Sequence, residues 1–134
     1  MRQKCFWHLY FDGSHAKGKF GARIYIIIPS AQNIKFSFKL NFDCTNNVVE
    51  YEALVNGLLL LKNMKVRTVN IFGDSQLIIN RVKGTYHTKH LRMRAYRNEV
   101  FDILGNFFLE YDIMLISRFK NIVANSLDTT TSGY

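Results

Sequence analysis

The first third of the chain alternates short apolar runs with turn residues, which is the pattern of consecutive β-strands. Three such runs, rich in aromatic and β-branched residues, cover residues 6–12, 20–28 and 34–42, and we expect a strand in each. In the third run, polar residues occupy every second position, as in a strand that exposes one face at the edge of a sheet. Because short turns join the runs, the three strands are predicted to form an antiparallel meander.

Helical spacing replaces this alternation after residue 45. The apolar positions of the next segment recur every three or four residues, at Ala53, Leu54, Gly57, Leu58 and Leu61. They predict a helix that Thr45 or Asn46 caps and that ends near Asn63.

The rest of the chain continues to alternate strands and helices. We expect strands over residues 66–72 and 111–117, helices over 76–82 and 90–108, and a last helix from Asn121. A strand, a crossover helix and another strand imply parallel pairing. The sequence therefore predicts one α/β domain over residues 1–134, in which a five-stranded mixed sheet combines a three-strand antiparallel meander with two parallel strands and is flanked by helices.

The composition is that of a globular protein with an excess of positive charge. Hydrophobic residues make up 48% of the 134 residues and charged residues 21%, which argues against disorder. The longest apolar run, residues 24–28, is too short to span a bilayer. We expect no secretory signal, and the two cysteines make neither a disulfide framework nor a zinc site. An intracellular protein of the cytoplasm or nucleus is therefore expected.

The net charge favours a polyanionic partner. Eighteen Lys and Arg residues oppose ten Asp and Glu residues, and no acidic residue lies between Ser75 and Asn98. Nucleic acid is the first candidate and an anionic membrane surface the second. A solvated basic helix face is the plainer interpretation of the same segment.

Three acids fall at positions where chemistry is expected. Asp12 closes the first predicted strand, Asp74 closes the fourth, and Glu50 lies on the apolar stripe in the first turn of the predicted helix. Each acid taken alone is better explained as a cap or a turn former. If the two strands are parallel neighbours, however, all three carboxylates meet at one end of the sheet. An oxygen-only ligand set of this kind suits Mg²⁺ or Mn²⁺ and not zinc.

Three motifs carry a family resemblance. They are Phe11-Asp12-Gly13-Ser14, Thr45-Asn46-Asn47-Val48-Val49-Glu50-Tyr51-Glu52-Ala53-Leu54 and Gly73-Asp74-Ser75-Gln76. In order and spacing the chain resembles the type 1 ribonuclease H family. The segments Asp43-Cys44-Thr45-Asn46-Asn47 and Leu91-Arg92-Met93-Arg94-Ala95-Tyr96-Arg97 look most like the ribonuclease H domain of plant gypsy-type LTR retrotransposon polyproteins. The resemblance implies the ribonuclease H-like fold and hydrolysis of the RNA strand of RNA–DNA hybrids to 5′-phosphate and 3′-hydroxyl ends. It also implies two Mg²⁺ ions, which Mn²⁺ can replace, a monomer, and a reverse transcriptase in the same polyprotein as a partner.

The resemblance assigns four catalytic and metal-binding positions, namely Asp12, Glu50, Asp74 and Asn125. Asn125 stands where the family has a fourth acid, in the segment Asn121-Ile122-Val123-Ala124-Asn125-Ser126-Leu127. Asp128 lies three residues further on and shares a helical face with it if the helix persists. The histidine that many members carry before this helix is missing from residues 118–120.

The resemblance also assigns substrate-binding positions. Asn46, Asn47 and Gln76 match residues that contact the minor groove of the hybrid, where amides both donate to and accept from 2′-hydroxyl groups. Ser14 and Thr45 are expected to contact backbone or phosphate, and Arg92 and Arg94 belong to the basic segment. Helix capping is the alternative role of the asparagines.

Two other functions remain open at this point. The chain could be a hybrid- or dsRNA-binding module that keeps the fold but has lost most of its catalysis, as Asn125 suggests. It could also be a structural tether within a larger polymerase, although that leaves the three acids unexplained.

Overall fold

The computed structural model describes residues 6–16, 19–30, 32–40, 46–82 and 91–116, and within them five strands and three helices. In chain order these elements are β1 (Trp7–Ala16), β2 (Lys19–Ile27), β3 (Asn33–Leu40), α1 (Asn46–Asn63), β4 (Thr68–Gly73), α2 (Gln76–Val82), α3 (Leu91–Phe107) and β5 (Glu110–Leu115). The helix predicted from Asn121 lies outside the described residues. None of the described helices is long and apolar enough to cross a membrane.

The strands form one mixed sheet in the order β3-β2-β1-β4-β5. β1, β2 and β3 make the antiparallel meander, and β4 pairs in parallel with both β1 and β5. The predicted fold class is therefore confirmed, and the condition that the first and fourth strands are parallel neighbours is met. The predicted edge position of the third strand is confirmed as well.

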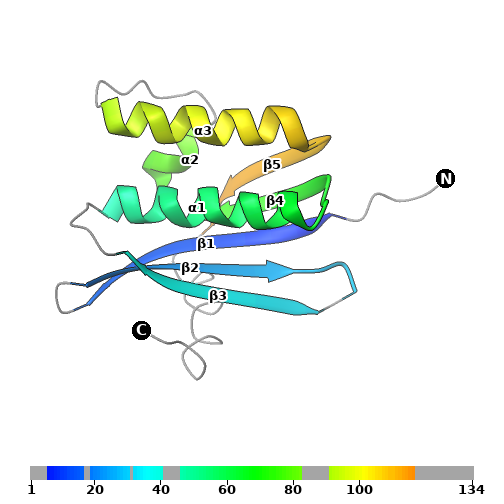
Figure 1. Ribbon diagram of the computed structural model, residues 1–134, viewed down its shortest axis with the longest axis horizontal. Coiled ribbons are helices and arrows are strands. Elements are labelled where there is room, and N and C mark those ends of the chain that lie inside the picture. The colour runs from blue at the N-terminus through cyan, green and yellow to red at the C-terminus, as the bar shows by residue number, and fades with distance from the viewer. Residues whose placement is uncertain (1–5, 17–18, 31, 41–45, 83–90, 117–134) are drawn as a thin grey trace.

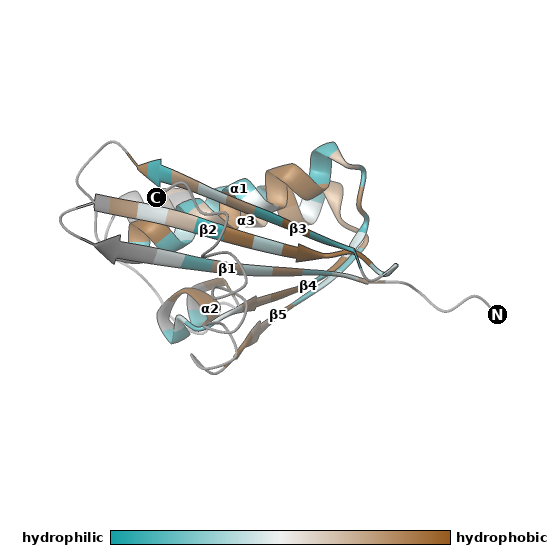
Figure 2. Cartoon of the chain, turned by 90° about the horizontal axis from the view of Figure 1, so that it is seen from below, coloured by the Kyte–Doolittle hydropathy of each residue, from teal (hydrophilic) through white to brown (hydrophobic). Residues whose placement is uncertain are grey.

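The core lies between the sheet and α1. Figure 1 shows α1 running along one face of the sheet, with α3 beyond it, and α1 contacts β1, β2 and α3. Figure 2, seen from below, shows the five strands fanned out in front of these two helices. All five apolar positions that predicted α1 are buried, and Gly57 lets the helix approach closely, because a Cβ there would lie 2.9 Å from Leu9 Cδ1.

The opposite face of the sheet carries an aromatic cluster. Alternation along β1 places Leu9 and Phe11 in the core and Tyr10 on the other face. Tyr10 stacks on Phe72 at 4.8 Å between ring centroids, and Tyr25 lies 6.0 Å from Tyr10. Burial, followed by electrostatic repulsion from Tyr25, raises the pKa of the Tyr10 hydroxyl.

Two predicted boundaries were wrong for identifiable reasons. β4 begins at Thr68 and not at residue 66, because the preceding residues cap α1. The N–H of Val66 donates to the carbonyl of Leu61 and that of Lys65 to the carbonyl of Lys62, with Lys65 at φ 62°, which is a Schellman cap. β1 continues to Ala16, so Asp12 lies inside the strand and does not close it.

Candidate metal centre

The three acids predicted to converge do lie together. Asp12 lies on β1, Glu50 lies on α1, and Asp74 is the residue that follows β4. Each offers one carboxylate oxygen, and these oxygens all lie within 4.8 Å of one another. All three side chains are half-buried. Carboxylates packed this closely repel one another unless a cation is shared between them, so the arrangement fits a site for divalent metal.

A close contact between β1 and β4 sets the positions of Asp12 and Asp74. Phe11 precedes the first acid and Gly73 precedes the second. A Cβ on Gly73 would lie 2.4 Å from Cζ of the Phe11 ring, which is 1% exposed. Because glycine leaves this space to the ring, the two strands can approach, and the two carboxylates that follow come within reach of a common ligand.

A second glycine brings Glu50 to the site. A Cβ on Gly13 would lie 2.8 Å from Val49 Cγ1 and 3.1 Å from Glu50 Cγ. α1 therefore packs directly onto the strand backbone beside Asp12. Glu50 is the fifth residue of α1, so its predicted place in the first turn was wrong, whereas its predicted place on the sheet-facing side is confirmed.

The structure places Asp74 beside the cap of α2 and not at the cap itself. Ser75 caps α2, because its Oγ accepts from the N–H of Ile78 at 3.4 Å and its carbonyl accepts from Ile79 at 3.0 Å. Asp74 does not make this cap, and its carboxylate lies in the acidic cluster. Glu52, predicted to point elsewhere, accepts a hydrogen bond from Asn56 Nδ2 at 3.2 Å and is not among the three acids of the cluster.

Arg23 is the site residue that sequence reasoning missed. It lies on β2 directly opposite Asp12, and its Nη2 donates to Asp12 Oδ2 at 3.1 Å. The Gly-rich segment expected to form a turn at residues 17–19 was a usable signal, because the register that pairs Ala16 with Lys19 also places Arg23 opposite Asp12.

Two of the predicted substrate-binding side chains belong to the described part of the chain, and each lies within three residues of an acid of the cluster. Asn47 is half-buried at the start of α1, three residues before Glu50, and Gln76 is exposed at the start of α2, two residues after Asp74. The other predicted site residues have side chains outside the described set: Ser14, Thr45, Asn46, Arg92, Arg94 and Asn125, together with Asp128.

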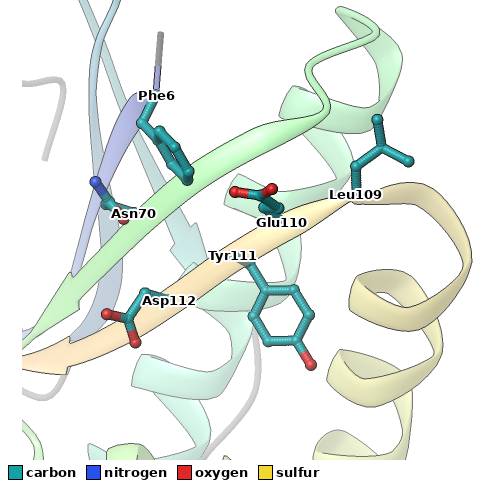
Figure 3. A pocket seen from close by; sticks show the side chains of 6 residues that line it. All are labelled: Phe6, Asn70, Leu109, Glu110, Tyr111 and Asp112. Carbon is teal, nitrogen blue, oxygen red and sulfur yellow. The ribbon is translucent and has the colours of Figure 1, made fainter. Parts of the chain in front are cut away.

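A pocket elsewhere on the sheet is separate from this cluster. Figure 3 shows it between the start of β1 and the first residues of β4 and β5, lined by Phe6, Asn70, Leu109, Glu110, Tyr111 and Asp112. The three acids of the cluster are not among its lining residues. The candidate metal centre is therefore formed by residues near the carboxyl end of β4 and not by this pocket.

Comparisons with known proteins agree with this architecture. The family described as reverse transcriptase-like matches residues 10–130. Among solved structures, ribonuclease H1 from the halophilic archaeon Halobacterium salinarum has 24% identity and a TM-score of 0.81, covering 90% of this chain and 92% of that one. LC11-RNase H1 in complex with an RNA/DNA hybrid has 26% identity and a TM-score of 0.80, with the same coverage.

A more distant structure shows the same fold. The N-terminal ribonuclease H domain of a Mycobacterium tuberculosis protein, solved as a fusion with maltose binding protein, has 20% identity and a TM-score of 0.75, covering 92% of this chain and 91% of that one. The search of curated proteins finds no match. The family match extends over most of the chain, and on that ground the protein belongs to the reverse transcriptase-like family and has the ribonuclease H-like fold.

Proposed function

We propose that the protein is a divalent-metal-dependent endonuclease that cleaves the RNA strand of RNA–DNA hybrids. The convergence of Asp12, Glu50 and Asp74 within 4.8 Å on a ribonuclease H-like fold carries this proposal. LC11-RNase H1, which is similar over most of its length, was solved with an RNA/DNA hybrid. The formal charge of +8 suits a substrate of that kind.

The three carboxylates would hold the metal, Mg²⁺ by preference and Mn²⁺ as a substitute. Bound there as a pair, such ions would activate water and stabilise the leaving oxygen, giving 5′-phosphate and 3′-hydroxyl ends. Asn125 is proposed as the fourth ligand, contributing a neutral carbonyl oxygen where an acid would add charge. It weakens the site compared with a set of four acids.

The protein's own polar side chains would position the hybrid. Asn47 is the second residue of α1, which carries Glu50, and Gln76 is the first residue of α2, which follows Asp74. We assign both to the 2′-hydroxyl groups of the RNA strand. Asn46, Thr45 and Ser14 are proposed to assist them. Arg92 and Arg94, in the first turn of α3, are proposed to contact phosphates and to supply affinity without sequence preference.

The family description also suggests where the domain acts. We propose that it is a single, monomeric domain of an LTR retroelement polyprotein of the plant gypsy type, working beside a reverse transcriptase. The resemblance of the segments Asp43-Cys44-Thr45-Asn46-Asn47 and Leu91-Arg92-Met93-Arg94-Ala95-Tyr96-Arg97 to such domains supports this origin.

A labelled RNA–DNA hybrid incubated with Mg²⁺, Mn²⁺ or EDTA tests the proposal. The RNA strand should be cut with either metal, DNA duplexes should be spared, and EDTA should stop the reaction. D12N and D74N should remove cleavage and leave hybrid binding intact. D112N is the matched control, because Asp112 is an exposed acid in the separate pocket, and it should cut at the wild-type rate.

Two results would contradict the proposal. Cleavage that survives EDTA would exclude the metal mechanism. Inactivity with both metals, combined with tight hybrid binding, would support the second candidate, a binding module weakened by Asn125. That candidate rests on the replacement of the fourth acid and on the same basic surface.

A further inference from the structure

A fixed positive charge lies inside the acidic cluster. The guanidinium of Arg23 donates from Nη2 to Asp12 Oδ2 at 3.1 Å, and the two side chains are only 23% and 13% exposed. Pairs this sheltered are screened less by water and salt than those on an open surface.

The environment of Arg23 indicates that the positive charge of its guanidinium keeps the side chain beside Asp12. Its Nε is buried and has no hydrogen-bond partner within the described part of the chain. A buried donor without a partner opposes folding, so this placement does not satisfy the hydrogen-bonding capacity of the guanidinium. The ion pair with Asp12 is a favourable interaction that offsets this cost.

The charge balance of the cluster follows from this. Asp12, Glu50 and Asp74 carry three negative charges when ionised, and Arg23 cancels one of them. The remaining charge of minus two balances one divalent cation, and a second cation would bring the cluster to a net charge of plus two as long as no substrate phosphate is bound. We propose that Arg23 is a built-in counter-charge that holds Asp12 in the metal-free protein and lowers the affinity of the cluster for divalent cations. This inference rests on the proposed function only in assuming that the cluster binds metal.

The size of the effect follows from distance. A cation bound to Asp12 lies ~2.1 Å from the carboxylate oxygen, and Nη2 lies 3.1 Å from Oδ2. The cation and the guanidinium are then roughly 5 Å apart. Even with the screening of bulk water, repulsion between a single and a double positive charge at that separation lowers affinity roughly tenfold.

Mn²⁺ binding to the full chain without nucleic acid tests the inference, with the electron paramagnetic resonance signal of free Mn²⁺ as the readout. R23Q should bind about tenfold more tightly than wild type, and R23K, which keeps the charge, should bind like wild type. R67Q is the matched control, because Arg67 is exposed, precedes β4 at the end away from Asp74, and changes the net charge equally. It should leave the affinity within a factor of two or so.

Thermal unfolding gives a second readout. Without metal, R23Q should unfold at a lower temperature than wild type because the carboxylates lose their counter-charge, and saturating Mn²⁺ should raise its melting temperature more than that of wild type. R23M keeps the aliphatic stem and serves if R23Q fails to fold. An affinity for Mn²⁺ that is unchanged or weaker in these variants would overturn the inference.

The two proposals fail separately. D12N should abolish tight Mn²⁺ binding in both the wild-type and the R23Q backgrounds, which ties the signal to the cluster. If R23Q binds Mn²⁺ more tightly than wild type but the chain cuts no hybrid, the role of Arg23 would stand and the nuclease proposal would be refuted. If the chain cuts hybrids but R23Q and R67Q have the same affinity for Mn²⁺, the nuclease proposal would stand and the role of Arg23 would be refuted.

Discussion

The contact between Phe11 and Gly73 controls the spacing of the two strands that carry Asp12 and Asp74, and G73A should disrupt it. The added Cβ would lie 2.4, 2.6 and 3.1 Å from Cζ, Cε1 and Cε2 of the ring. Non-bonded carbons settle at ~3.5–4.0 Å, so either the ring or the strands must move by about 1 Å. Phe11 is 1% exposed and belongs to the hydrophobic core, so we expect the strands to separate.

The expected cost is at the upper end of that for an overpacked core. Such substitutions cost ~1–3 kcal/mol, and we expect about 3 kcal/mol here because both partners belong to paired strands. For a domain of this size that lowers the melting temperature by roughly 10 °C. Cleavage of the hybrid should fall further than stability suggests, by about 100-fold, because a displacement of ~1 Å separates the catalytic carboxylates.

A double-mutant cycle isolates the contact. F11L removes the ring atoms nearest to Gly73, so it should relieve part of the cost of G73A, with a coupling free energy of ~1–2 kcal/mol measured by urea unfolding of the four proteins. G105A is the control for the chemical change: a Cβ there meets nothing within 4 Å, and it should stabilise α3 by ~0.5–1 kcal/mol. Additive effects of F11L and G73A, within ~0.5 kcal/mol, would refute the reasoning.

Three further predictions test the site and its surroundings. G13A should push Glu50 away from the cluster, costing ~1–3 kcal/mol in urea unfolding and weakening Mn²⁺ binding; unchanged Mn²⁺ affinity would contradict this. N125D should add a ligand charge and lower the metal concentration needed for half-maximal cleavage by about tenfold, and an unchanged midpoint would place residue 125 outside the site. The raised pKa of Tyr10 means that its stabilising contribution is complete below about pH 10 and is lost above it. The free energy of unfolding of Y10F should therefore fall less than that of wild type between pH 9 and pH 11 or so. Y25F should still show the part of this fall that comes from the burial of Tyr10.

Much of the fold could be predicted because hydrophobic periodicity reports which face of an element is buried. The stripe from Ala53 to Leu61 is buried as a unit against the sheet, and that was enough to place Glu50 on the correct side of α1. The predicted meeting of Asp12 and Asp74 depended on the first and fourth strands being parallel neighbours, and the structure meets that condition.

The details that periodicity could not supply depend on register and on close packing. Arg23 reaches Asp12 only because the hairpin register pairs the two residues, and a shift by one position would turn Arg23 to the other face of the sheet. The contact of Phe11 with Gly73 depends on how closely two strands approach, which no residue pattern within one strand encodes. Residue 125 stays a prediction, because its side chain lies outside the described part of the chain.

The extension of β1 beyond its predicted end explains how the site forms. β1 pairs with β4 only from Trp7 to Tyr10, whereas it pairs with β2 as far as Ala16. Asp12 therefore lies two residues beyond the last parallel pair, still held by β2 on one side, where β4 has ended on the other. After β4 the chain continues into α2. Asp74, just beyond the end of β4, therefore lies together with Asp12 and with Glu50 from α1. A first strand that ended at Asp12 would leave this carboxylate on a loop. The antiparallel hairpin keeps it on a rigid element, opposite the arginine that balances its charge.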